Sequence, residues 1–152
     1  PLVTTPEYLK LRTTIPLCKD GLYNSYKGMA TFNYKKFILS GNKKSVKKYL
    51  YVLRALLAGT HALETGHIEP NLPKLNGIYG YIPLIGSMID MKRRGKENGM
   101  LEPDEKVENL IQDWFAAIDI AYQDSNLPEK PDEEDTERVE QAIRKLRLAN
   151  IT

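Results

Sequence analysis

The sequence has little of the chemistry on which many enzymes and membrane proteins depend. It contains one cysteine, Cys18, and two histidines, His61 and His67. One cysteine excludes an internal disulfide, and these three side chains are too few for a usual structural zinc site. The longest run without a charged residue, 75–89, contains three glycines and one proline. That run is shorter than the roughly 20 apolar residues of a membrane span, so we expect a cytoplasmic protein with no membrane partner.

The recurring catalytic motifs are also missing from the sequence. Neither histidine accompanies the serine of a nucleophile elbow. Gly86-Ser87 is not followed by the lysine of a phosphate-binding loop. No Asp-x-Asp pair is present to hold magnesium ions. The acidic run 132–135 lies where a helix begins, and carboxylates are favoured there by the helix dipole. We therefore assign no catalytic residue and no metal ligand within this chain.

What the sequence does contain is helical periodicity, without a convincing alternating strand pattern. We expect one all-α domain over 1–152, a bundle of about four main helices with some shorter pieces. The main helices are expected from Asp20 to about Ser40, from Ser45 to Gly66, from Pro103 to before Asn126, and from near Pro131 to Arg147. The last helix is expected to turn Val139, Ala142, Ile143 and Leu146 inward.

The connections between these helices are predicted from proline and glycine. Pro6 at a first helical position indicates a short helix around residues 5–7. Pro70 and Pro73 predict a loop over 67–76. Residues 78–94 contain Pro83 and two glycines, which weaken a single helix and make two short helical pieces as plausible.

Positive charge is concentrated in the first part of the chain. Residues 1–54 carry eleven Lys and Arg against two acids, a net of +9, whereas 55–152 carry eleven against eighteen, a net of −7. The two values give the overall charge of +2. This asymmetry favours an anionic partner for the first part, although the two parts can equally attract each other.

Lysines and aromatic rings alternate between Lys27 and Lys48, where seven lysines occur and no acid. Lysine suits phosphate, and aromatic rings can stack on bases. The alternative is a helix pair with its rings in the core and its lysines in water. If the stretch contacts an acceptor molecule or nucleic acid, the candidate residues are Tyr23, Tyr26, Lys27, Lys35, Lys36, Lys43 and Lys44.

One stripe of the second predicted helix combines basic, aromatic and imidazole side chains. At helical spacing one face beside the leucines carries Lys47, Tyr51, Arg54, Ala58 and His61. Such a stripe can hold a triphosphate or an RNA backbone. It can equally be a polar flank whose side-chain stems cover the core.

Three segments of the sequence together carry a resemblance to a known family. The first is Tyr23 with Tyr26-Lys27-Gly28 and Ala30, and the second is KKYLYVLRALL at 47–57 with LETGHIEP at 63–70. The third is SNLPEKPD at 125–132. From about Tyr23 to Leu146 the chain resembles the helical half of the predicted nucleotidyltransferases, the DNA polymerase beta-like group associated with RNA repair. The third segment is similar to that family's Leu-Pro-x-x-Pro-Asp linker.

The resemblance implies that a catalytic domain, with a Gly-Ser motif and an Asp-x-Asp pair, precedes the helical half in the intact enzyme. That domain would hold Mg²⁺ and a nucleoside triphosphate, and it is absent from 1–152. This chain is then expected to be the C-terminal half and inactive alone, with the catalytic domain, a nucleotide and RNA as partners. Lys47, Lys48, Tyr51 and Arg54 would face nucleotide or acceptor, with His61 completing the predicted phosphate-binding set.

Two other functions are consistent with the same residues. The chain can be a stand-alone helical module that binds RNA or another polyanion through its lysine stretch. It can also be a small helical ribonuclease similar to the HEPN group, whose signature is an arginine, four to six residues, and a histidine. Arg54 and His61 have that spacing.

Overall fold

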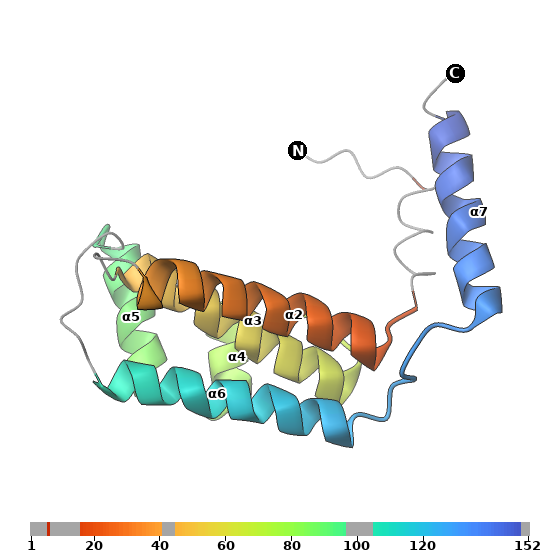
Figure 1. Cartoon of the computed structure of the whole chain (residues 1–152). Coiled ribbons are helices and arrows are strands. Elements are labelled where there is room, and N and C mark those ends of the chain that lie inside the picture. The colour runs from red at the N-terminus through yellow and green to blue at the C-terminus, as the bar shows by residue number, and fades with distance from the viewer. Residues whose placement is uncertain (1–5, 7–15, 41–44, 97–104, 150–152) are drawn as a thin grey trace.

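The computed structural model describes residue 6 and the ranges 16–40, 45–96 and 105–149, and these ranges contain helices and no β-strand. The predicted all-α class is therefore confirmed. In chain order the elements are α2 (Lys19–Asn33), the π-helical η1 (Tyr34–Leu39), α3 (Val46–Thr65), α4 (Leu72–Ile78), α5 (Pro83–Arg93), α6 (Glu105–Asp124) and α7 (Glu133–Ala149) (Figure 1). No described helix is both long and apolar enough to cross a bilayer.

Helix α3 is the centre of the bundle, and α2 and α6 pack along it (Figure 1). The Ser45 hydroxyl accepts a hydrogen bond from the Lys48 amide at 3.4 Å, and Gly66 ends the helix with φ 73°, where glycine is favoured. Both predicted ends are confirmed. The buried surface of α3 is wider than the predicted leucine stripe because neighbours cover several of its sides.

Helices α2 and α6 complete the core. The apolar face of α6 is buried against the bundle, from Val107 through Trp114 to Ala121. Helix α2 begins at Lys19, one residue before the expected start, and Cys18 rather than Asp20 holds the cap position. Asp20 instead accepts a hydrogen bond from the Tyr122 hydroxyl at 2.6 Å. The first amides of α2 donate to carbonyls of the linker before α7, which satisfies donors that a helix start leaves unpaired.

The predicted loop over 67–76 is wrong, because α4 begins within it. The Asn71 side chain accepts a hydrogen bond from the Lys74 amide at 3.0 Å and caps the helix. Pro73 lies in the first turn, where a missing amide proton leaves no hydrogen bond unmade. Pro83 likewise begins α5, so 78–94 contains the end of α4, a turn and one continuous helix.

The predicted helix near the C-terminal end is confirmed as α7, but its predicted inward packing is wrong. None of the described α7 side chains is buried, and Ile143 is 37% exposed. Figure 1 shows α7 apart from the bundle. Asp132 caps it by accepting from the Asp135 amide at 2.6 Å. An amphipathic pattern specifies that a helix has an apolar face, whereas its spacing says nothing about which surface that face meets.

Two predicted helix starts fall largely outside the described residues. Of the short helix around 5–7, only Pro6 is described, and it is helical. The predicted start at Pro103 lies outside the described ranges, and the helix is described from Glu105.

Candidate functional site

A cavity of about 480 Å³ opens beside α3, between that helix, the residues around the start of α4, and the end of α5. Helix α3 contributes one wall and α5 the facing one. The lining consists of Lys47, Leu50, Tyr51, Arg54, Pro70, Asn71, Leu72, Pro73, Ile89, Lys92, Arg93 and Gly95.

The cavity is strongly basic. Four of its lining residues are cations, Lys47, Arg54, Lys92 and Arg93, and its lining contains no carboxylate. In the described part of the chain none of the four forms an ion pair. Arg54, Lys92 and Arg93 are exposed, and Lys47 is half-buried. Because like charges converge here without acidic partners, the cavity has a positive potential that attracts anions.

Tyr51 links the two cations of α3. The Lys47 ammonium lies 5.9 Å and the Arg54 guanidinium 5.6 Å from the centre of its ring. Both contacts follow from helical spacing, since the cations precede and follow Tyr51 by about one turn. The predicted stripe is thus brought together at these three residues, and their role as phosphate ligands stays a prediction.

The other two members of the predicted phosphate-binding set lie elsewhere on α3. The Lys48 ammonium is 5.5 Å from the centre of the Phe37 ring, outside the cavity lining. The His61 ring lies perpendicular to the Tyr79 ring, with ring centres 6.5 Å apart, and also does not line the cavity. Burial, followed by a hydrogen bond to Glu64, raises the pKa of Tyr79.

Sequence reasoning missed Lys92 and Arg93 as site residues. At the end of α5 these two cations also have a local role, because they compensate the negative end of the helix dipole. The signal that could have found them is a run of three cations, 92–94, with no adjacent acid. Only the packing of α5 on α3 shows that Lys92 and Arg93 line the same cavity as Arg54.

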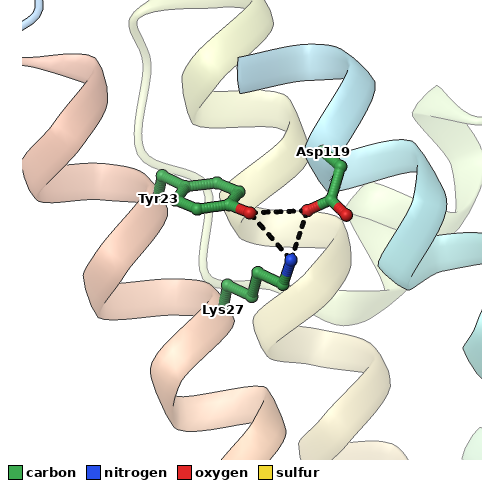
Figure 2. Close-up of polar contacts among 3 residues, drawn as sticks. All are labelled: Tyr23, Lys27 and Asp119. Atoms are coloured by element: carbon green, nitrogen blue, oxygen red, sulfur yellow. Dashed lines mark hydrogen bonds and ion pairs between the residues drawn. The ribbon is translucent and has the colours of Figure 1, made fainter. Parts of the chain in front are cut away.

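Tyr23 and Lys27, predicted as acceptor or nucleic-acid contacts, join α2 to Asp119 of α6 (Figure 2). The Tyr23 hydroxyl donates to Asp119 Oδ1 at 2.8 Å. The Lys27 ammonium donates to Tyr23 Oη at 2.7 Å and to the same carboxylate oxygen at 2.5 Å. The Lys27 charge is therefore matched by a carboxylate, and the group stabilises the crossing of the two helices.

Both charged groups of this cluster are held ionised. Burial disfavours the charge of Asp119, but hydrogen bonds from Lys27 and Tyr23 outweigh it and lower the Asp119 pKa below its usual 3.8. Burial also disfavours the Lys27 charge, and its bonds to Asp119 and Tyr23 raise the Lys27 pKa.

We expect Asp119→Asn to remove a pH-dependent part of the stability. Because the Asp119 pKa is depressed in the folded state, its contribution is present above about pH 3.8 and is lost as pH falls through the lower folded value. The wild-type advantage over Asp119→Asn in the free energy of unfolding should therefore shrink below about pH 4, as measured by urea denaturation at several pH values. Asp113→Asn, at an exposed carboxylate of α6, is the control. An advantage of constant size at all pH values would contradict the prediction.

The remaining predicted acceptor contacts are dispersed. Tyr26 packs on α3 beside Gly59, and burial raises its pKa. Lys35 and Lys36 are exposed on η1, and the Lys36 ammonium lies 5.3 Å from the centres of two phenylalanine rings. Lys43 and Lys44 lie outside the described residues.

The described residues do not fit a metal site of their own. Within the described ranges, no three His, Cys, Asp or Glu side chains gather closely enough to hold a metal ion. Magnesium prefers carboxylate and phosphate oxygens, and the cavity lining contains no carboxylate. The chemistry available in the cavity is therefore the binding and orientation of an anion.

The chain belongs to the RNA repair pathway DNA polymerase beta family (RlaP), whose family model matches residues 3–145, nearly the whole chain. This match confirms the DNA polymerase beta-like, RNA-repair-associated resemblance and extends it toward the N-terminal end of the sequence. Comparisons with curated proteins and with solved structures found no significant match.

Proposed function

We propose that this chain is the helical, nucleotide-binding portion of a nucleotidyltransferase, and that its basic cavity binds the phosphates of a nucleoside triphosphate. The observation that carries the proposal is the cavity itself. It brings four cations and one aromatic ring together without a carboxylate, in a member of a DNA polymerase beta family. Its volume of about 480 Å³ is within the range of small-molecule sites.

The physical argument is electrostatic. Phosphoryl and nucleotidyl transfer depend mainly on positioning the phosphates and neutralising the charge that develops on them. Arginine offers two parallel donors to phosphate oxygens, and lysine offers a compact charge. Arg54 and Lys47 from α3 and the cations of α5 approach the cavity from two sides. A polyphosphate between these walls would be held at several oxygens.

The metal-binding carboxylates of such an enzyme are proposed to lie in a catalytic domain outside this chain. Mg²⁺ held there would supply neutralisation of the charge on the phosphates. The residues described above would bind the nucleotide from the other side of the interdomain cleft. On this proposal the chain alone binds nucleotide but does not transfer it.

The proposal predicts that Lys47→Ala and Arg54→Ala each weaken nucleotide binding about tenfold or more, because each removes one charged contact of roughly 1.5–3 kcal/mol. Titration calorimetry with ATP at low salt measures the affinity. Lys145→Ala removes an exposed cation of α7, outside the cavity, and should bind ATP as the wild type does. Wild-type affinity in both cavity variants would contradict the proposed function.

A second candidate function is binding of RNA as a polyanion, and one patch favours it. Phe32 is 60% exposed at the end of α2, and the adjacent η1 presents Lys35 and Lys36. Binding through this patch would weaken steeply with salt and would survive the cavity substitutions. For the ribonuclease alternative the structure adds no support, because Arg54 lines the cavity and His61 does not.

A further inference from the structure

A second, smaller cavity of about 120 Å³ adjoins the basic one. The two share Pro73, Ile89 and Arg93 in their linings, so they lie side by side along α5. The smaller cavity adds Tyr81, from the turn between α4 and α5, and Asp90. Neither residue belongs to the set on which the proposed function depends.

Tyr81 is held in a strained backbone conformation. It has φ 57°, and it is the one non-glycine residue in the described ranges with positive φ. Such strain in a bulky residue persists only where surrounding contacts impose it, and it concentrates at functional sites. The strain therefore requires an explanation in terms of what the turn presents.

The contacts that impose the conformation come from Asn76, whose residue surface is only 2% exposed. The Tyr81 amide donates to the Asn76 carbonyl at 2.8 Å. The Asn76 side chain accepts from the Ile82 amide at 2.8 Å and donates to the Ile82 carbonyl at 3.3 Å. Three hydrogen bonds thus fix the backbone on both sides of the Tyr81 side chain.

The Tyr81 ring packs against α5 at Gly86 and is largely exposed to solvent. A Cβ on Gly86 would overlap the phenol ring, so the missing side chain at this position lets the ring approach the helix. Tyr81 is nevertheless 61% exposed. A large aromatic residue that is both fixed in orientation and open to solvent has the properties of a stacking platform.

Charge distinguishes the two cavities. The larger is lined by four cations and no acid, whereas the smaller is lined by one cation, Arg93, and one acid, Asp90. Pro73 and Ile89 add apolar surface beside the Tyr81 ring. The smaller cavity therefore suits a flat, uncharged group attached to an anion in the larger one.

We propose that Tyr81 stacks on the base of a nucleoside triphosphate whose phosphates occupy the basic cavity. This inference rests on the proposed function and assigns the base-binding end of the same site. Stacking of a base on an aromatic side chain changes affinity by about tenfold, and it tolerates different bases because each has a π-face.

The test compares ATP with inorganic tripolyphosphate, which has the phosphates and no base. We expect Tyr81→Ala to weaken ATP binding about tenfold and to leave tripolyphosphate binding unchanged. Tyr81→Phe keeps the ring and should bind both probes as the wild type does. Tyr81→Gly removes the ring and also relieves the positive φ, so it gives the same result in a backbone without strain.

Several outcomes would overturn the inference. ATP binding in Tyr81→Ala and Tyr81→Gly equal to that of the wild type would show that the ring does not contact the base. An equal loss for both probes would show that Tyr81 only supports the fold of the site. If the wild type binds tripolyphosphate as tightly as ATP, the base site is rejected while the proposed function stands. If the wild type binds neither probe, both proposals fail.

Discussion

Replacing Gly59 by alanine is expected to destabilise the protein by about 3 kcal/mol. Gly59 lies on α3 where α2 and α6 cross it. A Cβ there would be 2.5 Å from the Cβ of Tyr26 and 2.8 Å from Ile118 Cδ1. The Tyr26 Cβ is attached directly to the α2 backbone and cannot rotate away. The helices must therefore separate, and neighbouring core contacts are lost with them.

Gly28→Ala is the matched control for this substitution. Gly28 is an exposed residue of α2, and a Cβ there would have no neighbour within 4 Å. The same change should stabilise the protein by about 0.5–1 kcal/mol, because glycine has a higher conformational entropy in the unfolded chain. Urea denaturation of the wild type and both variants should thus give shifts of opposite sign. A Gly59→Ala variant as stable as the wild type would refute the close-crossing interpretation.

The second large effect is expected for Asn76→Ala, with a loss of about 2 kcal/mol or more. The Asn76 side chain is the hydrogen-bond partner of both the amide and the carbonyl of Ile82. Alanine leaves the Ile82 amide without its partner beside the core, and an unpaired buried amide is costly. The Ile82 carbonyl loses the Asn76 bond but still accepts from the Gly86 amide at 3.1 Å. The turn that presents Tyr81 would then no longer be fixed.

Two measurements check the Asn76→Ala prediction. Denaturation gives the loss of stability, and Asn24→Ala, at an exposed site of α2, should be nearly neutral. In conditions where the variant is folded, ATP affinity should fall as in Tyr81→Ala, with tripolyphosphate affinity retained. Unchanged stability would contradict the structural role of Asn76. Unchanged ATP affinity in a destabilised variant would show that Asn76 stabilises the fold but is not needed to position Tyr81 for binding.

The parts of the site that could be predicted from the sequence lie on a single helix. Lys47, Tyr51 and Arg54 share a face of α3 because their spacing is that of a helix, and the predicted ends of α3 are those observed. The core face of α6 was predictable for the same reason. In each case, the face of the helix is defined by residues that are only three or four positions apart in the sequence.

The parts that could not be predicted depend on more distant residues or on ambiguous signals. A proline such as Pro73 is equally compatible with a loop and with the first turn of a helix. The structure has the helix α4, which Asn71 caps. Lys27 belongs to a basic stretch in the sequence, yet Asp119, from a helix far along the chain, neutralises it. The backbone of Tyr81 has a positive φ beside its hydrogen bond to Asn76, and a tyrosine in the sequence does not signal this conformation as a glycine would.

The sequence by itself determined the all-α class, the principal helices and the basic stripe of α3, because helical periodicity, capping and charge spacing act over a few neighbouring residues. Tertiary structure alone decided that Lys92 and Arg93 line the same cavity as Arg54, that Tyr81 stands beside them, and that α7 lies apart from the core. These outcomes depend on which apolar faces pack together, and a local pattern shows that such a face exists without specifying its partner.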